Sequence, residues 1–190
     1  MNKQSNLYKK IILGFVFIII INTSLFCESN IINQEFQNFG FSLLNNGLFI
    51  LPPLIWNIVF IAKTPTYYSL GSAPKSLIIA ENILRTATFI SPFFVPININ
   101  HAFFNPGLVV FSVGLGLYFS SWLLLMYFPE LEISQKNITR LLPALTPIIW
   151  LVGIGLMSQA PISYSILATG FICTHIGEYL FRFNIIDYNY

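Results

Sequence analysis

The chain has 190 residues, of which 55% are hydrophobic and only 8% are charged, and its formal net charge is +2. Charged residues make up about a quarter of an ordinary soluble domain, so too few are present here to cover a water-facing surface. Disorder is excluded as well, because disordered chains combine low hydrophobicity with many charges. We therefore expect an all-α integral membrane protein with several membrane-spanning helices.

The first apolar segment has the layout of a secretory signal. Three lysines precede an uninterrupted apolar run from Ile11 to Ile21, and a more polar stretch follows as far as Ser29. This run is shorter than the roughly 20 residues that a full span needs. The sequence predicts that residues 1–29 are a signal peptide cut after Ser29, a retained signal anchor, or a leader whose Cys27 carries a lipid. Each alternative places residue 30 outside the cytoplasm.

Five further apolar stretches follow within residues 30–190, which we expect to form a single polytopic domain. Each is long enough to cross a hydrocarbon core of about 30 Å as a helix. The stretches are continuously apolar and do not alternate, which favours helices over barrel strands. The predicted bundle therefore has five transmembrane helices plus the N-terminal signal peptide or signal anchor. The five spans cover residues 41–62, 76–97, 106–128, 141–158 and 162–181.

The basic residues indicate how the chain is threaded. In a chain that crosses the membrane at each predicted span, eight of the nine lie in segments on the same side of the membrane. The ninth, Arg85, lies inside a span. Because cytoplasmic loops are enriched in Lys and Arg, we expect these segments and the C-terminus to be cytoplasmic. Abundant Ile, Asn, Phe, Tyr and Lys suggest an A+T-rich genome, and we expect a bacterial cytoplasmic (inner) membrane. The eight residues are Lys3, Lys9, Lys10, Lys63, Lys75, Lys136, Arg140 and Arg182.

Polar side chains inside the spans are the first candidates for a site, because such groups are costly in lipid. Glu81 and Arg85 lie four residues apart, on one face of a helix, with the acid first, which is the favourable order for an ion pair. The threading places Glu178 at the depth of Glu81. We expect a ligand-binding polar pocket open to the cytoplasm. Its candidate residues are Asn57, Glu81, Asn82, Arg85, His175 and Glu178.

A structural role for the same charges remains open, because long side chains near a helix end can extend to the lipid headgroups. We expect no metal and no cofactor. His175 and Glu178 have the spacing of metal ligands, but His101 lies on the opposite side of the membrane. We also expect no catalytic residues, because a Gly-x-Ser-x-Gly nucleophile motif is missing and Cys173 lies in apolar surroundings.

Small residues predict where helices pack closely, and tryptophans predict which residues lie at the depth of the lipid headgroups. Ser112, Gly116 and Ser120 are spaced by four, which predicts a ridge that lets another helix approach closely, and Gly153 and Gly155 are expected to serve similarly. An aromatic belt at the headgroups is expected of Trp56, Trp122 and Trp150.

The function that these features favour is non-enzymatic: a membrane subunit, or a protein that binds a small ligand or lipid. An alternative is a small proton-coupled transporter that uses Glu81 and Glu178, and a third is a membrane-embedded enzyme without a recognisable motif. The expected partners are the lipid bilayer and either a membrane protein or a second copy of the chain. Nucleic acid is not expected, because the sequence has no basic run.

Overall fold

The computed structural model describes residues 41, 45–64, 73–97, 99–100, 102–135, 137–158 and 161–182. Within these ranges the fold is helical, apart from an isolated bridge between Ile97 and Ser158. Four helical segments are long and apolar enough to cross a membrane, as expected of a membrane protein. These segments are Asn46–Lys63, Lys75–Phe94, Phe104–Tyr127 and Thr139–Met157. The predicted signal at residues 1–29 lies outside the described residues.

The helices begin and end close to the predicted spans, except that the first starts at Asn46 and not at residue 41. α9 has 22 residues but is not among the four segments above. Polar side chains are spread along its whole length, from Ser163 and Ser165 to His175, Glu178 and Arg182. In chain order the elements are η1 (Asn46–Phe49), α3 (Leu51–Phe60), η2 (Ile61–Lys63), α4 (Lys75–Ile90), η4 (Ser91–Phe94), α5 (Phe104–Tyr127), α6 (Glu132–Gln135), α7 (Asn137–Leu145), α8 (Pro147–Met157) and α9 (Pro161–Arg182).

Proline sets two of the helix boundaries. Pro52 lies in the first turn of α3, where a missing backbone N–H leaves no hydrogen bond unmade. Pro147 begins α8 and separates it from α7, because it cannot donate to the preceding turn. The amide of Thr146 still donates to the Leu142 carbonyl at 2.9 Å, so the chain stays helical through the junction. α7 and α8 therefore act together as one span.

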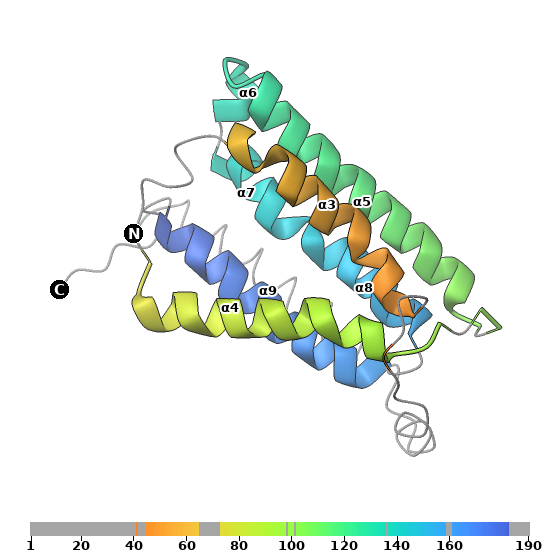
Figure 1. Cartoon of the computed structure of the whole chain (residues 1–190). Coiled ribbons are helices and arrows are strands. Elements are labelled where there is room, and N and C mark those ends of the chain that lie inside the picture. Colours follow the sequence, from red (N-terminus) through yellow and green to blue (C-terminus); the bar gives the residue numbers. More distant parts are fainter. Residues whose placement is uncertain are drawn as a thin grey trace, which may run out of the picture.

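The helices pack as two pairs. α5 lies along α8, α4 lies along α9, and α8 contacts α9. Figure 1 shows that the pairs come together near the end of α8 and diverge toward α6 and the start of α4. The space between the diverging arms is where a site can form.

Glycine allows the close approach of α5 and α8. A Cβ at Gly114 would lie 2.5 Å from the Trp150 backbone nitrogen, so only glycine fits. Gly153 meets the backbone of Phe111 in the same way, as the sequence predicted. The predicted ridge around Gly116 is wrong for packing within the chain, because a Cβ there would have no described atom within 4 Å. That ridge, with Ser112 and Ser120, is exposed on the outer face of α5.

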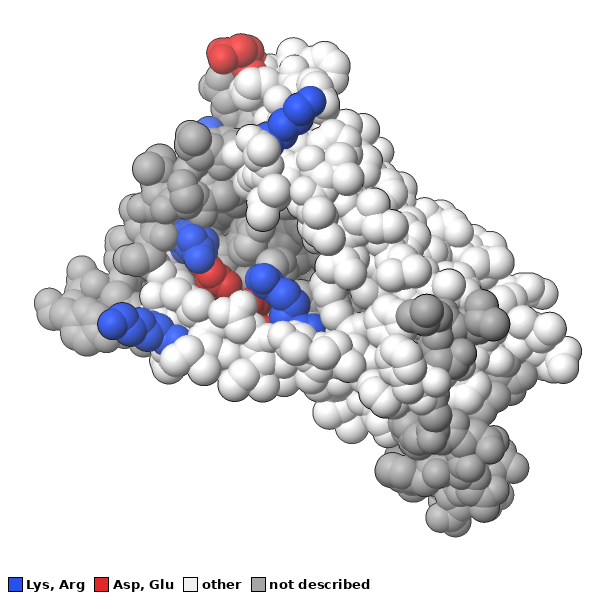
Figure 2. Space-filling view, viewed as in Figure 1, with Lys and Arg blue, Asp and Glu red and all other residues white. Residues whose placement is uncertain are grey.

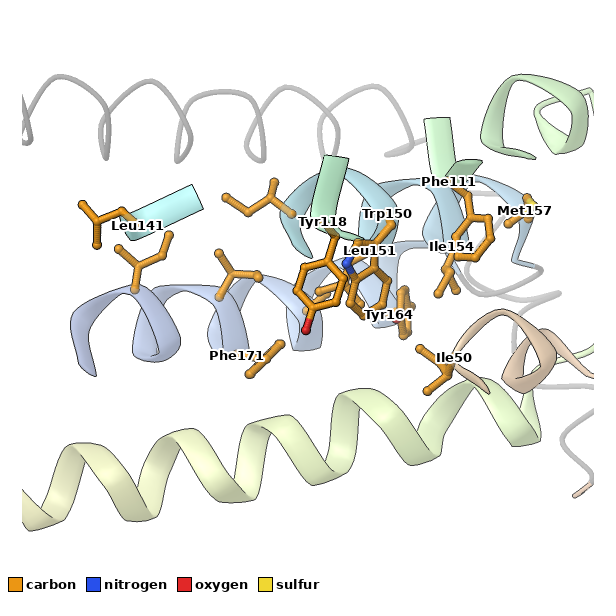
Figure 3. Packing of buried hydrophobic residues seen from close by; sticks show 14 of the residues in the cluster. Ile50, Phe111, Tyr118, Leu141, Trp150, Leu151, Ile154, Met157, Tyr164 and Phe171 are labelled. Atoms are coloured by element: carbon orange, nitrogen blue, oxygen red, sulfur yellow. The ribbon is translucent and has the colours of Figure 1, made fainter. Parts of the chain in front are cut away.

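The buried core joins the two pairs along α8 (Figure 3). Trp150 is only 2% exposed, so its predicted place in a headgroup belt is wrong. The outer faces of the helices carry many large apolar side chains, far more than a water-soluble surface exposes. Examples are Ile55, Ile58, Ile79, Ile83, Val109 and Val113. This distribution is that of a bundle whose outside faces lipid.

Hydrogen bonds from Asn45 and Asn46, together called the latch, join the chain segments at the end of the bundle where the helix pairs converge. The Asn46 side-chain amide donates to the carbonyl oxygens of Val95 and Pro96, at 3.1 Å each, and its backbone N–H also donates to Val95. Asn45 donates to the Phe93 carbonyl at 2.9 Å. Buried carbonyls at a helix end need such donors. The latch fixes the start of the first span against the end of α4.

Candidate functional site

A buried carboxylate links α4 to α9. Glu81 is fully buried, and its Oε1 accepts a hydrogen bond from Arg85 Nε at 2.9 Å and another from Arg85 Nη2. His175 Nδ1 lies 2.9 Å from the same oxygen. An ionised carboxylate only accepts, so His175 donates from Nδ1 and presents Nε2 on its other side. The predicted pairing of Glu81 with Arg85 is confirmed, and His175 joins it from the second helix.

This network positions two side chains. Arg85 is held through Nε and Nη2, while its side chain remains 42% exposed, so Nη1 is available to a neighbour. The His175 ring lies between Phe171 and Tyr179, with ring centroids 5.2 and 4.9 Å away. Because Glu81 and Arg85 carry opposite charges, the pair brings no surplus charge into the bundle.

These groups lie beside a cavity of about 250 Å³ between the two helix pairs. Figure 2 shows the molecule hollowed at this place, with basic and acidic side chains along the rim formed by α4 and α9. This volume is just below the roughly 300–1,000 Å³ of typical small-molecule sites, so it suits a small ligand or one ring of a larger ligand. The lining residues are Asn57, Ile61, Thr64, Arg85, Phe89, Tyr118, Trp122, Pro143, Pro147, Trp150, Phe171, His175 and Tyr179.

The α3 wall is fixed by contacts with α5. Tyr118 donates from its hydroxyl to Asn57 Oδ1 at 2.6 Å. Trp56 stacks on Phe119 with ring centroids 4.2 Å apart. Since the amide oxygen of Asn57 is used in this bond, its NH₂ group remains as a donor at the cavity.

The cavity lies at the basic end of the bundle. Thr64 follows Lys63, Pro143 comes three residues after Arg140, and Tyr179 comes three before Arg182. Lys63 donates to the Tyr127 hydroxyl at 2.6 Å, so the ends of α3 and α5 meet at this level. The threading predicted from the sequence would make this end the cytoplasmic one.

The structure brings four of the six predicted site residues together. Asn57, Arg85 and His175 line the cavity, and Glu81 supports the last two from behind. Asn82 does not line it, because its side chain is exposed on the outside of α4.

Glu178 is also separate from the cavity. Its Oε1 accepts from Arg182 Nε at 2.8 Å, so this second acid pairs within its own helix. Residues three apart on a helix are rotated by about 60°, which places His175 and Glu178 on neighbouring faces.

The aromatic lining is the part that sequence reasoning missed. Phe171, His175 and Tyr179 recur every four residues and form one face of α9, and Tyr118 and Trp122 have the same spacing on α5. That spacing was the available signal. It is hard to notice in a chain where 16% of residues are aromatic.

No protein-family model, curated protein or solved structure matches this chain. Its function is therefore inferred from the cavity and the residues around it.

Proposed function

We propose that this chain is an integral membrane protein that binds a small ligand in the cavity between its two helix pairs. The observation that carries the proposal is the Glu81 network set against an aromatic cavity. A fully buried carboxylate in a membrane helix is costly and by default marks a functional place. Here it orients Arg85 and His175 toward a space that a small ligand can fill. The proposed role is non-enzymatic.

The proposed setting is a bacterial cytoplasmic membrane, with α9 as the fifth span and the C-terminus in the cytoplasm. The clustering of Lys63, Lys75, Arg140 and Arg182 at the ends nearest the cavity supports this threading. The ligand would then enter from the cytoplasm or from the adjoining leaflet. The N-terminal segment is proposed to be a signal peptide or signal anchor.

The alternatives receive less support. Proton-coupled transport was expected to use Glu81 and Glu178 together, but Glu178 pairs with Arg182 and does not line the cavity. A subunit role is compatible with the open ridge at Gly116, which leaves room for a partner helix. The ridge gives no reason for a buried Glu81, whereas ligand binding does.

The test is native mass spectrometry of the protein purified in mild detergent from its own membrane. We expect a bound small molecule on the wild type. Arg85→Lys should lose most of it, because an ammonium cannot reproduce the planar fork of the guanidinium. Arg182→Lys is the matched control, since it alters an equivalent i,i+4 pair away from the cavity, and should keep the ligand. An empty wild type, or equal occupancy in both variants, contradicts the proposal.

A further inference from the structure

We propose that the ligand of this cavity is the head group of a lipid-soluble quinone. Such a head group is a flat, uncharged ring that carries carbonyl oxygens. This inference rests on the proposed function and specifies the ligand class. Three properties of the cavity lead to it: its walls, its unused hydrogen-bonding groups and its charge.

The walls are flat and aromatic. Phe89 connects Trp150 and Phe171, with ring centroids 6.1 and 5.7 Å away, and Tyr118 meets Trp150 at 6.4 Å. Figure 3 shows the Tyr118 hydroxyl directed toward α4, with the Trp150 indole beside its ring. A planar ring can pack on such walls in stacked or edge-on geometry. A saturated acyl chain would bury apolar surface here but would not gain the stacked or edge-on ring contacts.

Three unused polar groups of the lining are donors. The Trp150 indole N–H is buried without a hydrogen-bond partner among the described residues. The Asn57 amide keeps its NH₂ group once Oδ1 has accepted from Tyr118. Arg85 keeps Nη1 beyond its bonds to Glu81. The buried Trp150 N–H is unfavourable without an acceptor, and the more exposed Asn57 and Arg85 groups can donate to the same ligand, so the lining favours a ligand that offers oxygen acceptors.

The charge balance favours a neutral ligand. The Arg85 charge is already matched by Glu81, which leaves no surplus positive charge from this pair for a carboxylate or phosphate. An unmatched ion inside a low-dielectric site is strongly disfavoured. A ligand cation is disfavoured too, because the carboxylate does not line the cavity and Arg85 does. Neutral carbonyl oxygens satisfy the donors without adding charge.

The edge of the cavity at η2 is apolar and open. Ile61 lines the cavity and is itself 73% exposed. An isoprenoid tail can therefore remain among the lipid chains while the ring enters beside η2. This arrangement suits a ligand with a polar ring and a long apolar tail.

The experiment measures how ubiquinone-1, a short-chain quinone, quenches the tryptophan fluorescence of the purified protein. We expect saturable quenching, because Trp122 and Trp150 both line the cavity. Trp150→Phe keeps an aromatic ring but removes the N–H, and should weaken binding roughly five- to tenfold, the effect of one hydrogen bond. Trp56→Phe keeps an aromatic ring stacked on Phe119 and lies outside the cavity, so it should leave the affinity unchanged.

A second variant covers the case in which Trp150→Phe does not fold. Asn57→Asp preserves the acceptor for Tyr118 but replaces the amide donor with an anion, so quinone affinity should fall at least tenfold. Quenching that rises linearly without saturation, or that neither variant weakens, overturns the quinone inference. If native mass spectrometry then still finds another molecule lost in Arg85→Lys, the proposed function survives. If it finds none, both proposals fail.

Discussion

Replacing Glu81 with glutamine should destabilise the bundle far more than replacing an acid at its surface. The carboxylate accepts two hydrogen bonds from Arg85 and one from His175. Removing one partner of a buried ion pair costs about 3–5 kcal/mol. Arg85 is 42% exposed and keeps part of its hydration, so we expect the lower end, about 3 kcal/mol.

The assay is unfolding in mixed micelles, followed as SDS is titrated. Glu130→Gln is the matched control, because it removes the same charge from an exposed position and should change the unfolding free energy by less than about 0.5 kcal/mol. The double variant with Arg85→Gln should recover part of the loss, with a coupling energy of about 2 kcal/mol. If Glu81→Gln behaves like Glu130→Gln, the network does not hold α4 to α9. If the two losses simply add, Glu81 and Arg85 do not act as a pair.

Three further predictions concern packing, the latch and the threading. Gly114→Leu should destabilise the protein or prevent its folding, because its Cβ would lie 2.5 Å from the α8 backbone, whereas Gly116→Leu should unfold like the wild type. Asn46→Ala should lower the unfolding free energy by about 1–2 kcal/mol in the same SDS assay, since it removes both side-chain hydrogen bonds and leaves only the backbone N–H bond to Val95. An unchanged midpoint would show that the latch contributes nothing. A reporter that is active only in the cytoplasm should be active when it is fused after Tyr190, and a reporter that is active only outside the cytoplasm should be inactive there. The opposite result would reverse the predicted threading.

The positions of the spans could be predicted because they follow from local composition. A run of about 20 apolar residues must become a helix in lipid, whatever surrounds it. α5 begins two residues before the predicted start and ends one before the predicted end. The Glu81–Arg85 pair could be predicted for the same reason, since an i,i+4 spacing fixes the contact within one helix.

The rotation of each helix about its axis could not be predicted. Depth in the membrane placed Asn82 and Glu178 at the level of Glu81, but both side chains lie away from the cavity. Adjacent residues on a helix differ by about 100° around its axis, so equal depth does not imply a shared face. Trp150 was assigned to a headgroup belt on depth alone, although packing against α5 turns it into the core.

The measurement that tests the central claim most directly is an ¹⁵N spectrum of the tryptophan indole groups, recorded while the ligand identified by mass spectrometry is added back. The chain has three tryptophans, so the signals can be assigned by single Trp→Phe variants. We expect the Trp150 signal to shift and to saturate near one equivalent, while the Trp56 signal, which belongs to the outer side of α3, stays in place. An unchanged Trp150 signal beside a shifting Trp56 would place the ligand on the lipid-facing surface and contradict binding in the cavity.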